Sequence, residues 1–374
     1  MKTENIGLYV HIPFCLKKCN YCDFCSYSDL NKCQREGYIS SLLREIDSYK
    51  CEEKIGVDTV FFGGGTPSLL TSEEFTLICE KIKNTFSVSD NVEFTVEANP
   101  KTLTEEKLRT YVSCGVNRIS IGMQTIHENE RKILGRIHSF EDFKISYQLA
   151  LKSGIKNVNV DVMYGIPEQT LESFKETLNA VVTLNPAHIS AYGLILEEGT
   201  NFWKTKHNLD LPGEETECVM YDFLCEFLSS HGYKHYEISN FSKPGYESLH
   251  NLKYWRNQKY IGVGISAYSY FNSKRYGNTL KFSEYLSETS AKYSSCEVID
   301  KDAEAYEYAM LRLRLAEGIS LSEYKKQFGK DFLYGKEEKI NAYIKSGYVK
   351  FSNDRIALTE KGFYVSNAIL TELL

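Results

Sequence analysis

The stretch YVHIPFCLKKCNYC, residues 9–22, joins a predicted β-strand to a loop that carries three cysteines. Residues 7–12 are mostly apolar, as in a strand covered on both faces. Directly after them, Cys15, Cys19 and Cys22 follow a C-x3-C-x2-C spacing. Three thiolates from one loop can bind three irons of a [4Fe–4S] cubane, and the fourth iron then stays open for a ligand. A zinc site with a distant fourth ligand, or chance clustering, is the alternative for the same residues.

The remaining cysteines give no comparable pattern. The chain contains eleven cysteines, an odd number, and no export signal is visible at residues 1–7. Reduced thiols are therefore expected rather than a disulfide framework. Cys25 lies three residues beyond Cys22 and could be a spare thiol or a transient ligand. We expect it to have no catalytic role.

Composition places the chain among ordinary globular proteins. It has 374 residues, 42% of them hydrophobic, which is enough for one large domain and a smaller one. The net charge of −6 argues against general binding to nucleic acids or anionic membranes, because both require concentrated Lys and Arg. No apolar run approaches the ~18–20 residues that span a bilayer. We therefore expect a cytoplasmic protein.

Strand and helix signals alternate through the first half of the chain. Apolar strand candidates lie at 7–12, 59–62, 93–97, 118–122, 158–163 and 188–194. Helix candidates lie between them at 72–86, 104–114, 140–153 and 170–184. Strand–helix alternation predicts parallel βα units with right-handed crossovers. The expected fold is α/β, a partial (β/α)6 TIM-like barrel that binds ligands at the C-terminal ends of its strands.

The second half of the chain is organised differently. We predict a core domain at 1–235, a Tyr- and Gly-rich connecting region at 236–300, and a C-terminal domain at 301–374. The last segment is mainly helical and includes a short hairpin around Asn353 and Asp354, a winged-helix-like layout. Its basic and acidic residues nearly balance, so it is interpreted as a structural cap rather than a DNA-binding domain.

Polar residues follow several of the predicted strands. The run GGGTPS at 63–68 would let backbone N–H groups approach a bound anion closely. Glu97, Gln124, Arg136 and Asp161 lie at or near other strand ends. Each alone is more often a structural hydrogen-bonding residue. Together they predict a ring of polar groups at one face of the barrel.

These motifs together resemble radical S-adenosylmethionine proteins of the coproporphyrinogen-oxidase-like group. The matching segments are YVHIPFC (9–15), the cysteine run, GGGTPS (63–68), EANP (97–100), RISIGMQ (118–124), LGRIH (134–138) and DVMYGIP (161–167). The resemblance covers essentially the whole chain. It implies that S-adenosylmethionine chelates the open iron and that one electron from the reduced cluster releases a 5′-deoxyadenosyl radical.

The resemblance also implies which residues contact S-adenosylmethionine. They are Tyr9, Tyr21, Gly64, Gly65, Thr66, Glu97, Gln124, Arg136 and Asp161. Arg136 can pair with the methionine carboxylate, and the two carboxylates can accept hydrogen bonds from ribose hydroxyls.

Three details favour a heme-chaperone branch of this group over the oxidase. Phe24 stands where the oxidase has a further cysteine, and only eight residues precede Tyr9 where the oxidase has a long arm. The third is an H-N-x-x-Y-W signature at 250–255, which the resemblance associates with heme. His250 is then the candidate axial heme ligand, although an isolated histidine beside aromatic residues is usually a packed, hydrogen-bonded side chain. Tyr268 replaces a second histidine found in many relatives, and a tyrosine can also bind ferric heme.

The expected function is therefore heme binding and transfer to an acceptor protein. Oxygen-independent coproporphyrinogen III oxidase and a related radical methyltransferase are the alternatives, so whether the protein is an enzyme stays open. The resemblance implies a heme-accepting protein, with a membrane-associated acceptor as one option, and an electron donor such as flavodoxin or ferredoxin. Either a monomer or a heme-dependent dimer is expected.

Overall fold

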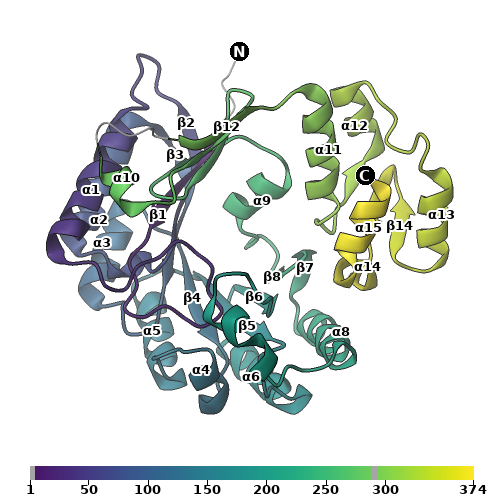
Figure 1. The fold of residues 1–374 in the computed structure, drawn as a ribbon, viewed down its shortest axis with the longest axis horizontal. Coiled ribbons are helices and arrows are strands. Elements are labelled where there is room, and N and C mark those ends of the chain that lie inside the picture. Colours follow the sequence, from purple (N-terminus) through teal and green to yellow (C-terminus); the bar gives the residue numbers. More distant parts are fainter. Residues whose placement is uncertain (1–4, 288–292) are drawn as a thin grey trace.

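The computed structural model describes residues 5–287 and 293–374. Six parallel strands are adjacent in the sheet in the same order as in the chain. They are β1 (Ile6–Ile12), β2 (Gly56–Gly64), β3 (Ser87–Ala98), β4 (Arg118–Gln124), β5 (Asn157–Tyr164) and β6 (His188–Gly193). The sheet curves and its connecting helices lie on the outer side (Figure 1). The predicted α/β partial (β/α)6 barrel is confirmed.

Four of the six connecting helices begin and end within one residue of their predicted positions, whereas no helix was predicted at Lys32–Asp47 or Glu128–Ile133. The connecting helices are α1 (Lys32–Asp47), α2 (Ser72–Thr85), α3 (Glu105–Cys114), α4 (Glu128–Ile133), α5 (Phe140–Lys152) and α6 (Leu171–Leu184), with a 3-10 turn η1 (Pro67–Leu69). Thr71 caps α2 because its hydroxyl accepts the Glu74 N–H while the Glu74 carboxylate accepts the Thr71 N–H. α3 ends at Gly115, which has the left-handed conformation of a helix C-cap.

Later segments of the chain extend both edges of this sheet. On the β6 side, β8 (Asn240–Ser242) and β7 (Lys234–Glu237) pair antiparallel. On the other side, β9 (Tyr260–Val263) pairs parallel with β1, and β10 (Tyr268–Phe271), β11 (Lys274–Asn278) and β12 (Tyr293–Val298) continue antiparallel. The intervening helices are α7 (Asn201–Thr205), η2 (Lys206–Asn208), α8 (Glu214–Ser230), α9 (Leu249–Trp255) and α10 (Phe282–Leu286). The Tyr- and Gly-rich region at 236–300 thus contributes strands to the same sheet as the core.

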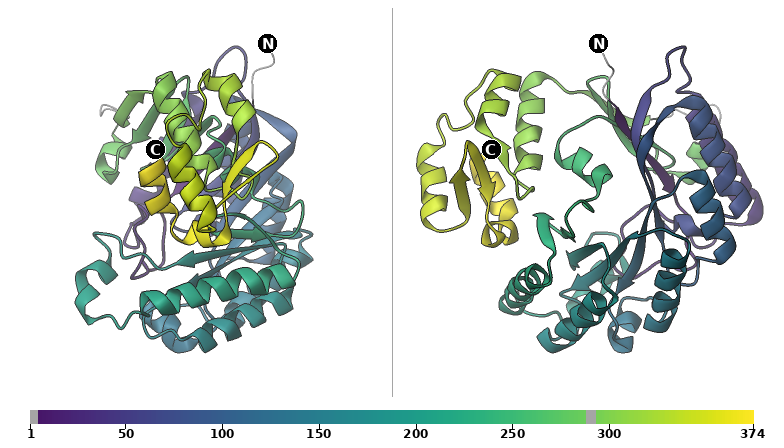
Figure 2. Two further views of the ribbon diagram at one scale, coloured as in Figure 1. Left: turned by 90° about the vertical axis from the view of Figure 1, so that its right-hand side faces the viewer. Right: turned by 180° about the vertical axis from the view of Figure 1, so that it is seen from behind.

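The C-terminal segment forms a small domain with its own three-stranded sheet. Its elements are α11 (Lys301–Arg312), β13 (Ile319–Ser320), α12 (Leu321–Phe328), α13 (Glu337–Lys345), β14 (Val349–Ser352), β15 (Arg355–Leu358), α14 (Glu360–Tyr364) and α15 (Ser366–Leu373). The strand order β13-β15-β14 and the flanking helices give the expected winged-helix-like layout. This domain faces the concave side of the large sheet, and α9 lies between them (Figures 1 and 2).

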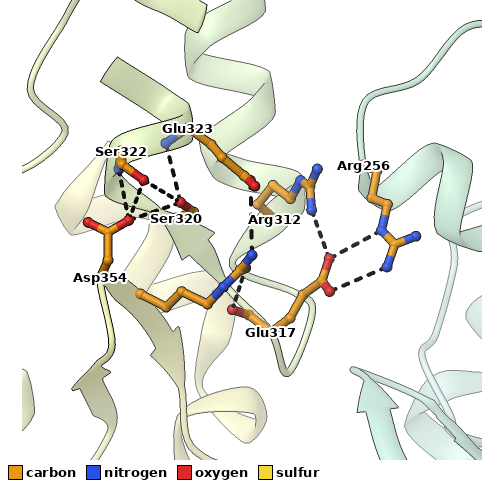
Figure 3. A network of polar contacts seen from close by, with 8 residues as sticks. Arg256, Arg312, Glu317, Ser320, Ser322, Glu323 and Asp354 are labelled. Atoms are coloured by element: carbon orange, nitrogen blue, oxygen red, sulfur yellow. Dashed lines mark hydrogen bonds and ion pairs between the residues drawn. The ribbon is translucent and has the colours of Figure 1, made fainter. Parts of the chain in front are cut away.

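Glu317 links the C-terminal domain to α9 (Figure 3). Its carboxylate accepts hydrogen bonds from Arg256, which directly follows α9, at 3.2 and 3.3 Å. It also accepts one from Arg312 of α11 at 2.8 Å. The position of α9 is therefore coupled to that of the C-terminal domain. No helix among residues 5–287 and 293–374 is both long and apolar enough to cross a membrane.

Candidate functional site

Alternate side chains of the parallel strands point into the barrel. They form a cavity of about 500 Å³ inside the curve of the sheet. With the exception of Tyr268, every residue that the sequence predicts for the cluster, for S-adenosylmethionine or for heme lines this cavity. They are Tyr9, Cys15, Cys19, Tyr21, Cys22, Gly64, Gly65, Thr66, Glu97, Gln124, Arg136, Asp161 and His250.

The cysteine loop connects β1 to α1 and is held by backbone hydrogen bonds at Cys15 and at Asn20. The Cys15 N–H donates to the Tyr27 carbonyl at 2.9 Å, and the Asn20 N–H donates to the Leu134 carbonyl at 3.0 Å. Cys15, Cys19 and Cys22 are free, partly exposed thiols. Within the described ranges, no three His, Cys, Asp or Glu side chains converge to hold a single metal ion.

Burial keeps two of these thiols protonated in the ligand-free chain. It raises the pKa of Cys15, and it raises the pKa of Cys22 to about 11. A bound metal would remove these protons, because a coordinated thiol is deprotonated. Three thiols on one loop, facing one cavity, fit a cluster that contains several irons.

The glycine run at the end of β2 packs against His11 of β1 and against the start of the cysteine loop. Gly64 has φ +113°, and a Cβ there would lie 2.6 Å from Cε1 of His11. A Cβ at Gly65 would lie 2.8 Å from the Phe14 carbonyl oxygen and 3.1 Å from Sγ of Cys15. Only glycine permits this close approach of backbone to the cysteine loop.

His11 positions Tyr9 and the segment around Cys25, a role that sequence reasoning missed. Nε2 of His11 lies 2.8 Å from the Cys25 carbonyl, which can only accept, so Nε2 carries the proton. Burial lowers the His11 pKa to about 4, and the unprotonated Nδ1 accepts from the Tyr9 hydroxyl at 3.1 Å. Cys25 is thus held through its backbone.

Two buried carboxyl groups face the interior. Glu97 accepts the Gly64 N–H at 3.2 Å, and burial together with nearby Asp161 raises the Glu97 pKa to about 8. Asp161 accepts from Asn159 Nδ2 at 2.6 Å and from the Ser120 hydroxyl at 3.3 Å. Burial also raises the pKa of Asp161, although the hydrogen bonds from Asn159 and Ser120 act in the opposite direction. Such groups can exchange hydrogen bonds with the hydroxyls of a ligand.

Arg136 is held firmly beside the cysteines. Its Nη2 donates to the Gly122 carbonyl at 2.5 Å and to Asn99 Oδ1 at 3.0 Å. Its Nη1 donates to the Tyr21 hydroxyl at 3.3 Å and lies 3.9 Å from Sγ of Cys19. A fixed guanidinium at this place suits an anionic group bound next to the cysteine loop.

His250 lines the cavity and is fully buried. Its Nδ1 is hydrogen-bonded to the Thr59 hydroxyl at 2.9 Å and its Nε2 to the Tyr254 hydroxyl at 2.8 Å. The ring stacks on Phe61, with 5.1 Å between centroids. Burial, with smaller contributions from Lys253 and Arg118, lowers the His250 pKa to about 3. A neutral imidazole with both nitrogens engaged has no free ligand atom in this conformation.

Tyr268 lies apart from His250, in an adjoining cavity of about 320 Å³. Cys25, Phe24, Tyr254 and Tyr260 also line this second cavity. Tyr268 is half-exposed, and Phe24 is 61% exposed. Phe24 lines both cavities, so an exposed apolar side chain is present where they adjoin.

Models of two protein families match segments of this chain. A model of the radical SAM superfamily matches residues 9–181, and one of the HemN C-terminal domain matches residues 299–365. Heme chaperone HemW of Lactococcus lactis is 34% identical over 98% of this chain and 96% of its own length. Heme chaperone HemW of Bacillus subtilis is 33% identical to this chain over 98% of both chains. Heme chaperone HemW of Escherichia coli is also 33% identical, over 99% of this chain and 98% of its own length.

One solved structure extends the comparison to the fold. The radical SAM enzyme coproporphyrinogen III oxidase, HemN, from Escherichia coli superimposes with a TM-score of 0.84 over 99% of this chain and 90% of that chain. Its sequence is only 22% identical, so it establishes the fold alone. The relatives, the two domain matches and this fold lead to one conclusion. The chain belongs to the HemW family of the radical SAM superfamily.

Proposed function

We propose that this protein binds heme and transfers it to an acceptor protein, and that it carries a [4Fe–4S] cluster with S-adenosylmethionine at the open iron. One observation supports this most strongly. The cysteines, the glycine run, the polar strand ends and the H-N-x-x-Y-W motif, which are distant in sequence, all contribute to one cavity. The relatives that share the chain's full length carry the name heme chaperone.

In this proposal Cys15, Cys19 and Cys22 hold the cluster, which supplies one-electron chemistry when bound. Arg136 binds the methionine carboxylate, since its guanidinium is already fixed beside Cys19. The other proposed contacts to S-adenosylmethionine are Tyr9, Tyr21, Gly64, Gly65, Thr66, Glu97, Gln124 and Asp161. Glu97, which holds a proton near neutral pH, can both donate to and accept from ribose hydroxyls.

The geometry adds a condition to the proposed role of His250. Axial ligation of heme by Nε2 requires that Tyr254 release its hydrogen bond to that nitrogen. Heme binding by His250 would therefore be accompanied by movement of the Tyr254 side chain. Tyr268 is half-exposed, whereas His250 is fully buried, and it is the second candidate ligand.

The proposal carries expectations about partners and location. A heme-accepting protein and a one-electron donor such as flavodoxin or ferredoxin are the expected partners, in the cytoplasm. The acceptor could be membrane-associated, and the protein itself could be a monomer or a heme-dependent dimer.

Anaerobic reconstitution with three readouts tests the proposal. Iron–sulfur absorbance should appear in the wild type and disappear when Cys15, Cys19 and Cys22 are all replaced by Ala. Heme should give a Soret band on titration. Decarboxylation of coproporphyrinogen III should be absent. Robust decarboxylation would establish the oxidase instead, and absence of heme binding would reject the chaperone function.

Two variants test the axial ligand separately. Tyr254→Phe frees Nε2 of His250 and should tighten heme binding and shift the Soret band, if His250 is the ligand. His250→Ala should remove that effect in the double variant. A Soret band that neither variant changes would exclude His250 and direct attention to Tyr268.

A further inference from the structure

Arg118 is an unusual residue of the barrel interior that the proposed function leaves without a role. It begins β4, and its side chain lies on the same inward face as those of Ser120 and Gln124. It lines the cavity, yet it is only 2% exposed. It is among the largest fully buried side chains of the protein.

The guanidinium of Arg118 is incompletely hydrogen-bonded among the described residues. Its Nε has no hydrogen-bond partner within residues 5–287 and 293–374. Arg118 also takes part in none of the ion pairs found in that part of the chain. An uncompensated buried charge costs several kcal/mol, so such residues normally have a counter-ion or a bound ligand. Arg136, by contrast, has four hydrogen-bond partners in the same cavity.

Nearby acidic groups do not supply the missing partner. Glu97 keeps its proton near neutral pH, because burial and Asp161 raise its pKa to about 8. Asp161 is already bonded to Asn159 and Ser120. Arg118 influences the pKa of both carboxyl groups through space without contacting them. The nearby imidazoles of His188 and His250 are neutral, since burial lowers both pKa values.

The position of Arg118 separates it from the place proposed for S-adenosylmethionine. Arg136 bonds to the carbonyl of Gly122, which is four residues beyond Arg118 on β4. At about 3.3 Å per residue, the Cα atoms of Arg118 and Gly122 are about 13 Å apart along the strand. Arg136 would therefore bind the methionine carboxylate next to Cys19. Arg118, deeper in the cavity, remains available to bind another anionic group. His250 and Tyr254 of α9 also face this inner part of the cavity.

We propose that Arg118 binds a carboxylate of a second ligand in the inner part of the cavity, namely a propionate of the tetrapyrrole. This inference rests on the proposed heme function. The guanidinium would form a charge-assisted, bidentate pair with the carboxylate, and the pair would replace the missing counter-ion. Arg118 is thereby assigned as a specificity-determining residue for ligands that carry a free propionate.

The test compares heme with heme dimethyl ester, whose propionates are uncharged. Both are titrated into the anaerobically reconstituted protein with S-adenosylmethionine present. The wild type should bind heme about tenfold to a hundredfold more tightly than the ester, the range for one charge-assisted pair. Arg118→Gln should bind both equally, and Arg118→Lys should retain part of the preference. Arg109→Gln is the control, because the side chain of Arg109 is 72% exposed on α3.

Two further measurements separate this role from a structural one. S-adenosylmethionine affinity should be unchanged in Arg118→Gln, since Arg136 provides that contact. The melting temperature of ligand-free Arg118→Gln should equal or exceed that of the wild type, because the substitution removes an uncompensated charge.

Each alternative result has a defined meaning. Equal wild-type affinity for heme and its ester would overturn the role of Arg118 and leave the heme proposal intact. Wild-type protein that binds neither would reject both. A lower melting temperature, failure to fold, or weakened S-adenosylmethionine binding in Arg118→Gln would show that Arg118 serves the barrel or the first ligand instead.

Discussion

The carboxyl group of Glu97 allows a quantitative test of the polar barrel interior. Burial and the neighbouring Asp161 raise its pKa from 4.5 to about 8. Replacing Glu97 by Gln removes the ionisation, while the amide oxygen can still accept the Gly64 N–H. The effect of Glu97→Gln on stability should therefore depend on pH.

The sign follows from where the proton is bound. Below pH 4.5 the group is protonated in both folded and unfolded chains. Between 4.5 and about 8 only the unfolded chain releases the proton. Wild-type stability then falls by about 1.4 kcal/mol per pH unit, and above pH 8 the full loss is on the order of 5 kcal/mol. The titrations of Glu97 and Asp161 are coupled, so the effect cannot be assigned to Glu97 alone. We therefore expect a measured gain in unfolding free energy of about 2–5 kcal/mol for Glu97→Gln.

Urea unfolding of the ligand-free protein at pH 5 and pH 9 measures this effect. Glu97→Gln should gain about 2–5 kcal/mol over the wild type at pH 9 and much less at pH 5. Glu141→Gln is the control, since the Glu141 side chain is 67% exposed. A difference between wild type and Glu97→Gln that is the same at both pH values would refute the buried, protonated state of Glu97.

Three further predictions concern the cysteine loop, the glycine run and the contact of Glu317 with two arginines. Cys25→Ala should retain full iron–sulfur absorbance, because His11 holds residue 25 through its backbone carbonyl, which the substitution leaves in place. Loss of absorbance would show that the Cys25 thiol is a cluster ligand. Gly64→Ala should weaken S-adenosylmethionine binding at least about tenfold, from backbone strain and overlap with His11. Gly115→Ala, also at positive φ but facing open space, should leave that affinity unchanged in the same titration. Glu317→Gln should lower the free energy of unfolding by about 1–2 kcal/mol in urea, since two arginines lose their shared carboxylate.

Much of the site follows from sequence because of how parallel sheets are built. Consecutive parallel strands place their C-terminal ends at one edge, so polar residues after separate strands must meet there. Cys15, Gly64, Glu97 and Asp161 could be assigned to one cavity on that basis. The ends of α2, α3, α5 and α6 were predictable for a local reason, because a capping residue such as Thr71 marks the start of its own helix. The helices α1 and α4 were not predicted.

Other features depend on contacts between distant segments and have no local signal. The H-N-x-x-Y-W motif marks a short helix, but not that Thr59 and Tyr254 occupy both nitrogens of His250. The missing partner of Arg118 is visible only when its surroundings are known. Nothing in the sequence distinguishes Glu317 from other surface carboxylates, and its contact with Arg256 is evident only in the structure.

The pairing of β9 with β1 has a consequence for synthesis of the protein. β1 is made before its outer neighbour β9, which follows about 250 residues later in the chain. At ~5–20 residues per second, the β1 edge stays unpaired for about 12–50 s. An exposed strand edge invites pairing with other chains. Nascent chains that stop near residue 235 should therefore aggregate or recruit folding helpers, even though all six core strands are already present.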